Sequence, residues 1–280
     1  MSTLFAWDSN GEELQQAGEG FAIIGQNDRP NAFLLSPRNW GRKHVQLRKG
    51  PHIIMQIPSN QQQPLNETEE RIRTAALRLF GQKGFQATST RELAAEAGLT
   101  VAGLYYYVGT KEALLLALTR DANEALLHSA RRIGASDEAP ERKLALLVQL
   151  HLWFHGEHAL ESRVINTELR SLSGEARQRA LELRDGYEAV WRTIIAQGND
   201  AGVFQVQNVK LGAMALIEMG RGISHWYRPE GALTLQEICS MHADWALGMV
   251  RATRNEKPVR VAAMNLGDPK DLYLVERITQ

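Results

Sequence analysis

The sequence is poor in cysteine, has no excess of either charge and contains no long apolar run. Cys239 is the single cysteine among 280 residues, so no intramolecular disulfide can form and a disulfide-stapled secreted fold is excluded. No run approaches the roughly 18 apolar residues of a membrane-spanning helix. Residues 1–28 contain five acidic residues and no Lys or Arg, unlike an export signal, which begins with basic residues. We therefore expect a cytoplasmic protein without a membrane partner.

Basic and acidic residues are balanced at 32 each. This balance excludes a protein that coats nucleic acid with a uniformly basic surface, but it is compatible with a local basic surface. Hydrophobic residues make up 44% and charged residues 23% of the chain, as in ordinary globular proteins. We therefore expect a folded core in most of the chain.

Residues 1–64 lack helical periodicity and are rich in Asn, Gln, Gly, Ser and Pro. This composition predicts a disordered extension. Residues 21–24 and 52–57 are candidates for short strands, and Met55 is an alternative start of the protein. Residues 29–50 contain six Lys or Arg residues and no acid, which is typical of a basic arm that adds nonspecific phosphate contacts.

From residue 65 onward, signals that start and stop helices recur at short intervals. Three pairs have the spacing of a capping box at a helix N-terminus: Asn66 and Glu69, Ser89 and Glu92, and Thr234 and Glu237. A helix, a short helix, a tight turn and a second short helix within about 40 residues predict a helix-turn-helix over residues 65–112. Gly98 supplies the left-handed backbone that this turn needs.

The second short helix, from Thr100 to Tyr107, is expected to be the recognition helix. Its N-terminal residues approach base edges in the major groove. Those residues are Thr100, Val101, Ala102 and Gly103. Small side chains allow the helix backbone to approach closely, and a Val or Ala methyl group can contact a thymine methyl group.

Three consecutive tyrosines and a lysine follow. Because Tyr105, Tyr106 and Tyr107 occupy one helical turn, we expect at least one to face the core and at least one to face outward. An outward phenol beside a groove donates a hydrogen bond to phosphate; the alternative is that the tyrosines are core aromatics at a helix end. Lys111 begins a long helix over residues 111–133, whose N-terminus favours an anion.

These segments resemble the DNA-binding domain of tetracycline-repressor-type (TetR family) regulators over about 60 residues. The similar runs are TAALRLF (74–80), KGFQATS (83–89), ELAAEAGLT (92–100) and GLYYYVGTKE (103–112). The resemblance implies an all-helical homodimer that binds a palindromic operator, with the fourth helix joining a ligand-binding C-terminal domain. It places Thr88 and Ser89 near phosphate at the start of the second helix. Tyr107 and Val108 depart from the family pattern, which has His and Phe there, and imply altered packing.

The rest of the chain predicts an all-α ligand-binding and dimerisation domain over residues 113–254, followed by a frayed tail over residues 255–280. Helices are expected over residues 140–156, 160–172, 174–198, 209–227 and 235–254. No strand is expected after residue 64. The last two helices are expected to pair with their copies as a four-helix bundle. Their apolar residues are Leu211, Met214, Ala215, Ile217, Ile238, Met241, Trp245 and Met249.

Aromatic and Met residues in this domain form either an ordinary core or a ligand cavity. The candidate lining residues are Trp153, Tyr187, Trp191, Met214 and Trp226. The candidate partners for an anionic head, among which the sequence does not choose, are Arg163, Arg170, Arg184, Arg221 and His225. ELRSLSG (168–174) and SHWYRPEG (224–231) resemble the subgroup that controls fatty-acid and sterol-side-chain catabolism. That resemblance implies an acyl-CoA or a related hydrophobic acid as effector.

The expected function is therefore a ligand-responsive dimeric transcriptional regulator, acting as a repressor, with no enzymatic activity, metal or cofactor. The alternative is a metal-dependent hydrolase that uses His151, His155 and His158, because this spacing can place three imidazoles on one metal. Gly156 interrupts that helix, and the sequence lacks the His-Glu-x-x-His pattern of metalloproteases. Exposed or hydrogen-bonded histidines are therefore the simpler interpretation.

Overall fold

The computed structural model describes residues 21–22, 55–56 and 67–273. Strands β1 (Phe21–Ala22) and β2 (Met55–Gln56) pair antiparallel, with Phe21 opposite Gln56. Both strands fall within the segments that the sequence marks as candidate strands. The predicted disorder of the rest of residues 1–64, the Asn66 cap and residues 274–280 lie outside the described residues. Residues 67–273 belong to a separate compact unit.

Three helices form the N-terminal part of this unit: α1 (Glu67–Lys83), α2 (Thr90–Glu96) and α3 (Val101–Val108). The predicted capping box is confirmed, because the Glu92 N–H donates to Ser89 Oγ at 3.2 Å and the Ser89 N–H donates to Glu92 Oε2 at 2.8 Å. Thr100 caps α3 by accepting from the Gly103 N–H at 3.0 Å. Gly98 has φ +66° in the turn between α2 and α3, as its position predicts.

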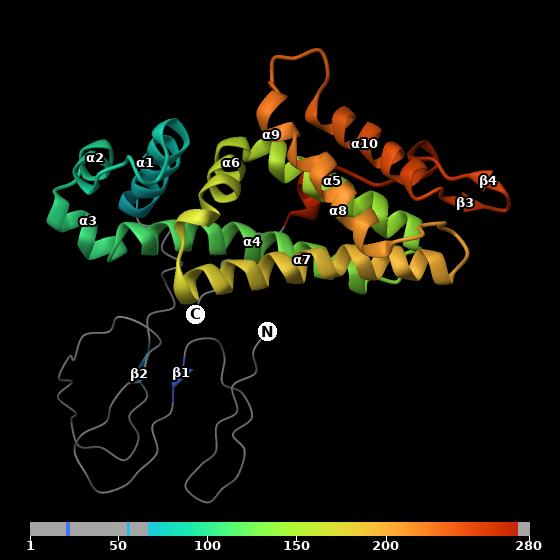
Figure 1. The fold of residues 1–280 in the computed structure, drawn as a ribbon, viewed down its shortest axis with the longest axis horizontal. Helices are drawn as coiled ribbons and strands as arrows, with labels where there is room; N and C mark the ends of the chain where they lie inside the picture. The colour runs from blue at the N-terminus through green and yellow to red at the C-terminus, as the bar shows by residue number, and fades with distance from the viewer. Residues whose placement is uncertain (1–20, 23–54, 57–66, 274–280) are drawn as a thin grey trace, which may run out of the picture. The chain divides into compact units, whose positions relative to one another are not determined.

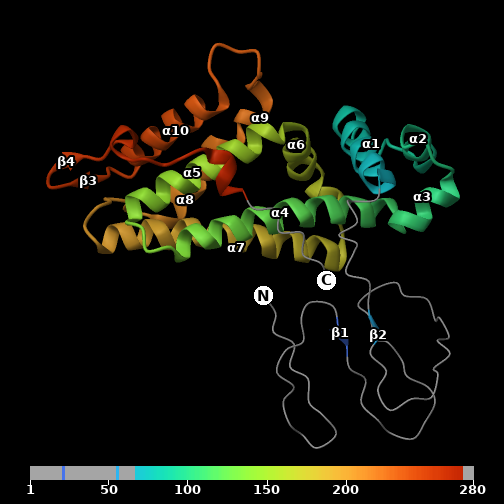
Figure 2. The ribbon, with the colours of Figure 1, turned by 180° about the vertical axis from the view of Figure 1, so that it is seen from behind.

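The long helix α4 (Lys111–Ala135) joins two hydrophobic cores. Its first half contributes Leu114, Leu115 and Leu118 to the core beneath α1, α2 and α3. Its second half contributes Leu126 and Leu127 to the core of the C-terminal domain. The helix-turn-helix lies at one end of α4, while α7 (Gly174–Asp200) lies alongside α4 in both views (Figures 1 and 2).

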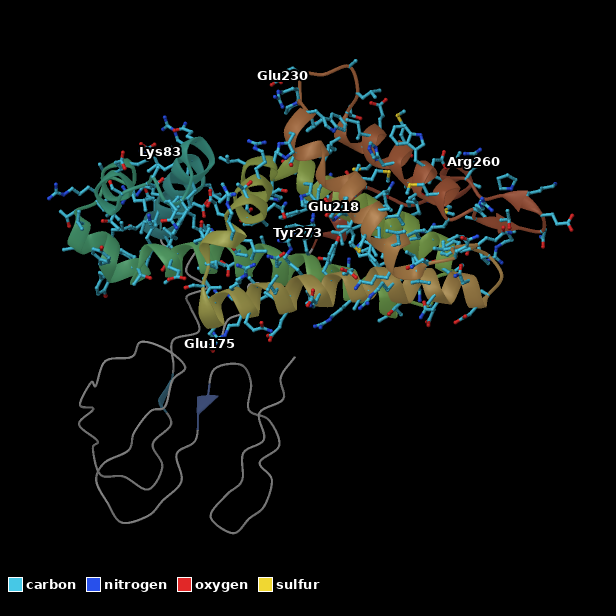
Figure 3. The ribbon with its side chains drawn as sticks, in the orientation of Figure 1. Lys83, Glu175, Glu218, Glu230, Arg260 and Tyr273 are labelled. Atoms are coloured by element: carbon cyan, nitrogen blue, oxygen red, sulfur yellow. The ribbon has the colours of Figure 1, made fainter. Side chains whose placement is uncertain are left out.

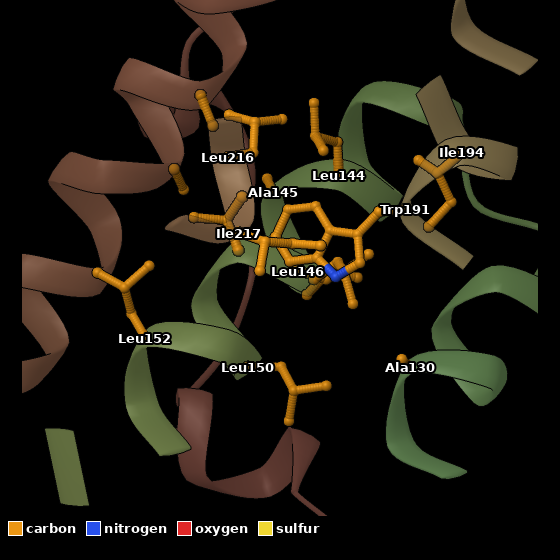
Figure 4. Packing of buried hydrophobic residues seen from close by; sticks show 14 of the residues in the cluster. Ala130, Leu144, Ala145, Leu146, Leu150, Leu152, Trp191, Ile194, Leu216 and Ile217 are labelled. Atoms are coloured by element: carbon orange, nitrogen blue, oxygen red, sulfur yellow. The ribbon is translucent and has the colours of Figure 1, made fainter. Parts of the chain in front are cut away.

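The C-terminal domain packs around α5. Its remaining elements are α5 (Pro140–Glu157), α6 (Ala159–Thr167), the 3₁₀ helix η1 (Glu168–Ser171), α8 (Val209–Arg221), α9 (Ile223–Trp226) and α10 (Leu235–Met249). Aliphatic residues of α5 surround Trp191 of α7 in the centre of this core (Figure 4). The all-α prediction is confirmed for this domain, although the helix predicted over residues 209–227 divides at Gly222 and the one over residues 160–172 ends in η1.

The predicted tail is ordered as far as Tyr273, so the prediction of a frayed segment is wrong for residues 255–273. Strands β3 (Thr253–Arg254) and β4 (Lys257–Pro258) form a hairpin, and the 3₁₀ helices η2 (Val261–Ala263) and η3 (Pro269–Leu272) follow. The hairpin also shows that the expectation of no strand after residue 64 is wrong. The helix α10 ends at Met249. Asn255 and Glu256 form the turn of the hairpin, with φ +50° and +62°. The buried residues here are too widely spaced to create a periodic pattern.

Candidate nucleic-acid interface and effector domain

The outward face of α3 is formed by Ala102, Tyr105 and Tyr106, of which Tyr106 is 84% exposed. Leu104 points into the core and holds the helix on the domain. The expectation that one of the three tyrosines faces the core is wrong, because Tyr107 is also exposed and its ring meets that of Tyr106 edge-on at 5.4 Å. The aromatic surface on the C-terminal half of α3 is therefore larger than the sequence predicts.

Residues at the start of α2 differ in their access to solvent. Thr88 is 1% exposed, and its hydroxyl donates to the Gly84 carbonyl at 2.8 Å. The Thr88 side chain is therefore not on the surface that can face DNA, although the sequence predicts that it lies near phosphate. Ser89 is exposed, as is Arg91 in the first turn of α2, a candidate phosphate contact that the sequence interpretation missed.

The Lys111 ammonium group closes the loop between α1 and α2. Nζ donates to the carbonyls of Phe85 and Thr88, both at 2.8 Å, and lies 4.2 Å from the centroid of the Phe85 ring. Burial lowers the pKa of Lys111, and the nearby Glu168 carboxylate partly opposes this shift. Lys111 therefore supports the DNA-binding domain internally, a role that residue spacing does not indicate.

A set of ion pairs and contacts joins the DNA-binding domain to α6. Arg73 of α1 pairs with Asp121 of α4 at 2.7 Å and with Glu161 of α6 at 3.3 Å; we call these three residues the Arg73 latch. Gly81 of α1 lies directly against Leu160 of α6, where an added Cβ would come within 2.6 Å of the Leu160 side chain and force it to shift. The helix α6 thus contacts α1 directly, and Arg73 of α1 links it to α4.

The interior of the C-terminal domain contains a buried polar group. The Tyr187 hydroxyl lies 3.0 Å from His151 Nδ1, and His151 Nε2 lies 3.0 Å from the Ile217 carbonyl oxygen. Because a carbonyl only accepts, we assign the hydrogen to Nε2, which leaves Nδ1 to accept from Tyr187. His155 is hydrogen-bonded through Nδ1 to Ser162 of α6. Burial lowers the pKa of His151 to about 3, so this imidazole is neutral.

We expect the stability of the protein to fall as the pH drops below about 6.5. Burial lowers the pKa of both His151 and His155 below 6.5, so below that pH the unfolded chain binds protons that the folded protein excludes. Between pH 7.5 and 5.5 the loss should be about 1 kcal/mol for each histidine. Denaturant unfolding at several pH values measures it. In His151→Gln the slope should become shallower, and an identical slope in this variant would contradict the assignment.

Two of the candidate arginines, Arg184 and Arg221, lie within electrostatic reach of this polar group. The positive charges of Arg221 and Arg184 help to hold the pKa of His155 below its usual range, after the larger effect of burial. Arg163 donates to the Ser224 carbonyl, and Arg184 donates to Asn166 Oδ1 at 3.4 Å. The other two candidate cations, Arg170 and His225, are exposed. Of the five candidates that the sequence left open, the structure thus places Arg184 and Arg221 near the buried polar group.

The five residues predicted to line a cavity do not lie together. Tyr187 and Trp191 are buried in the core, and Trp153 is half-buried against Tyr273. Met214 and Trp226 are exposed, Trp226 to 52%, so their predicted place in the interior is wrong. Within the described residues, the indole N–H of Trp191 is one of four buried side-chain polar atoms with no hydrogen-bond partner.

The three histidines do not form a metal site. Both ring nitrogens of His151 have protein partners, and His158 lies at the corner after α5, where Nδ1 is 3.7 Å from Glu161. In residues 67–273, no three His, Cys, Asp or Glu side chains are grouped to hold a metal ion. The site that the hydrolase alternative requires is therefore not formed by these residues.

A second exposed apolar surface lies on α8, α9 and α10. Its large exposed side chains are Leu211, Met214, Trp226, Met241, Trp245 and Met249; we call it the α8–α10 face. Ile217 and Ile238, predicted to belong to it, point into the core instead. No helix in the part of the chain that the structure describes is long and apolar enough to span a bilayer.

The fold and the α3 surface define a helix-turn-helix transcriptional regulator. Residues 72–118 match the model for bacterial regulatory proteins of the tetR family, and residues 137–250 match the model for the tetracyclin repressor-like C-terminal domain. The chain belongs to the TetR family.

Individual relatives agree with this assignment. The HTH-type transcriptional repressor KstR2 of Mycobacterium tuberculosis is 26% identical over 175 residues, which span 62% of this chain and 88% of KstR2. The crystal structure of the TetR family regulator PfmR from Thermus thermophilus has 29% identity and a TM-score of 0.59, covering 66% of this chain and 100% of that one. AibR, solved with isovaleryl coenzyme A and operator DNA, shares the fold at 24% identity and a TM-score of 0.58, covering 64% of this chain and 97% of its own.

Proposed function

We propose that this protein is a cytoplasmic homodimeric repressor that binds a palindromic operator and releases it when a small hydrophobic effector binds the C-terminal domain. The observation that carries the DNA-binding part is the outward face of α3, where Ala102, Tyr105 and Tyr106 are exposed on a helix anchored by Leu104. Such a helix enters the major groove with its first residues on base edges.

The contacts with DNA divide into two kinds. Thr100, Val101, Ala102 and Gly103 approach bases, and their small size lets the backbone come close. Ser89, Arg91, Tyr105, Tyr106 and the N-terminal end of α4 at Lys111 contact phosphates, which fix the register of the protein on the duplex. Footprinting on the DNA upstream of its own gene tests this proposal.

The dimer is supported by the distribution of exposed apolar side chains. Among residues 67–273, the large hydrophobic side chains that are exposed lie on α3, at Leu160, or on the α8–α10 face and the adjoining Leu233. Exposed apolar side chains concentrated on a few helices in this way are typical of a protein interface. Two copies joined through α8 and α10 form a four-helix bundle and present two α3 helices to one operator.

The effector proposal rests on the buried polar group and its arginines. The Trp191 indole N–H is a donor without a partner in an apolar core, which suits an acyl carbonyl, and the Arg184 and Arg221 cations suit an anionic end. An acyl-CoA, or a related hydrophobic acid, has both features. The complex of AibR with isovaleryl coenzyme A agrees with this class of effector.

Release of DNA requires two states of the dimer that an effector binds unequally. Because Tyr187, Trp191 and His151 are buried, an effector reaches them only when α6 or α8 moves. Movement of α6 strains the Arg73 latch and the contact with Gly81, so the DNA-binding domains change their spacing. Coupling of about 1–3 kcal/mol gives a roughly 5–150-fold loss of operator affinity.

We expect Arg184→Gln to abolish the response to acyl-CoAs while leaving operator affinity unchanged. Arg184 acts on the buried polar group of the C-terminal domain and does not belong to the DNA-binding helices. Its loss should therefore remove the attraction for the anionic end of the effector and leave the DNA contacts intact. Operator titration by fluorescence anisotropy, with and without a panel of acyl-CoAs and their free acids, measures both quantities. Arg170→Gln, which replaces an exposed arginine on η1, is the matched control. If the same acyl-CoAs release the Arg184→Gln variant and the wild type from the operator equally well, Arg184 does not bind the anionic end of the effector.

A further inference from the structure

Residues 251–273, which we call the C-terminal strap, lie beyond the segment that the C-terminal family model matches. The strap packs along the domain through specific contacts. The Val261 N–H donates to Asp244 Oδ1 of α10 at 2.7 Å, Arg142 of α5 donates to the Asn265 carbonyl at 2.7 Å, and Pro269 is buried. The strap thereby connects the β3–β4 hairpin with the opposite end of α5.

The described part of the strap ends at Tyr273, whose side chain is labelled in Figure 3. Its ring packs against three rings at centroid distances of 5.5 Å for Trp153, 5.4 Å for Phe154 and 5.6 Å for His158. Trp153 and Phe154 lie near the C-terminal end of α5. His158 is the single residue between α5 and α6 and caps both helices, with φ −100° and ψ 44°. Tyr273 therefore packs on the corner that sets the direction of α6.

The same corner adjoins the Arg73 latch. His158 Nδ1 lies 3.7 Å from Glu161, the residue by which α6 pairs with Arg73 of the DNA-binding domain. Burial raises the pKa of Tyr273, and the negative charge of Glu161 adds to the shift while Arg73 opposes it. The phenol is thus within electrostatic reach of all three members of the latch, Asp121 included.

We propose that Tyr273 is a positioning residue that holds the α5–α6 corner and so keeps α6 where the Arg73 latch closes. This inference rests on the proposed function in one respect, namely that the closed latch belongs to the DNA-binding state. Without the ring, the corner has fewer packing partners and α6 moves more easily. The population then shifts toward the state that binds DNA weakly, in the absence of any effector.

The test compares two strap variants of the full chain. In Tyr273→Ala, hydrogen exchange of α6 amides should be about tenfold faster, because local opening becomes easier, and the operator dissociation constant should rise about fivefold through the population shift. Tyr273→Phe should behave as wild type, because ring packing does not need the hydroxyl. The matched control is Met264→Ala, which removes a half-buried strap side chain that packs on the domain core; its α6 exchange and operator affinity should not change.

Equal α6 exchange and equal operator affinity in Tyr273→Ala and Met264→Ala would overturn the proposal, whatever either variant does to the melting temperature. If Tyr273→Ala does not fold, Tyr273→Leu keeps apolar bulk without the aromatic packing and should change both quantities in the same direction. The exchange measurement needs neither operator nor effector. Failure of the wild type to bind any operator would therefore refute the proposed function while leaving the exchange result to decide on Tyr273.

Discussion

A protein carrying both Met241→Glu and Trp245→Glu is expected to be a monomer and to bind its operator roughly 100-fold more weakly than the wild type, or worse. Both side chains are exposed on α10 within the α8–α10 face, and each substitution adds a negative charge to both sides of the symmetric interface that we propose. A monomer binds one half-site only. It therefore loses the increase in affinity of about 10²–10⁴-fold that linking two binding modules provides.

Sedimentation at micromolar concentration measures the association, and anisotropy measures operator affinity. Gln236→Glu is the matched control, because it adds a charge to the same helix on the side that faces the strap, where Gln236 shares a surface depression with Met264 and Leu266. This control should remain a dimer. A double variant that sediments as a dimer and binds with wild-type affinity would place the interface elsewhere.

Replacing Lys111 with alanine should weaken binding to all DNA sequences by about tenfold or more and should also destabilise the DNA-binding domain. The substitution leaves the Thr88 carbonyl without its donor and removes one of the two donors to the Phe85 carbonyl, which keeps the Thr88 N–H. Loss of such partners costs about 1–3 kcal/mol of stability. Because the proposed interface places the N-terminal end of α4 at phosphates, removing the Lys111 cation should in addition lower the salt dependence of binding by about one unit.

Lys83→Ala is the control for this experiment, because Lys83 is a cation of the same domain that pairs with Glu92 on the surface. Exposed ion pairs contribute about 0–1 kcal/mol, so stability should change little in this variant. Thermal unfolding and operator titration at several salt concentrations separate the two effects of Lys111. A stable Lys111→Ala protein with an unchanged salt slope would contradict both roles.

Several helix boundaries could be predicted because their signals are local. Ser89 and Glu92, or Thr234 and Glu237, are three residues apart, so the capping box is contained in the sequence itself. Gly98 is equally local, since the turn requires a positive φ at one position. These features locate α3 and the start of α10 before any tertiary contact is known.

Contacts between distant residues could not be predicted in the same way. The partners of Lys111 are 23 and 26 residues away, and nothing in the spacing shows that its ammonium group turns toward backbone carbonyls. In α8 and α10, apolar residues occur on more than one side, so periodicity alone does not separate buried Ile217 from exposed Met214. The tertiary packing of α5 against both helices decides which side is the core.

The C-terminal strap is another part of the fold that could not be predicted from the sequence. Its buried residues, Ala252, Val261 and Pro269, fill separate places along the domain and are spaced without a helical or strand period. A pattern search therefore finds no element there, although each side chain packs against the domain. Irregular segments are ordered by the surface on which they lie, and that surface exists only after the helices have assembled.

The most direct test of the proposed function is footprinting of the purified protein on the DNA upstream of its own gene, repeated with a saturating acyl-CoA. We expect one protected segment with two symmetric half-sites about one helical turn apart, occupied by a dimer and exposed again when the thioester is added. Absence of any protected segment would contradict DNA-binding repression. A protected segment that no acyl-CoA or hydrophobic acid releases would instead contradict the proposed effector.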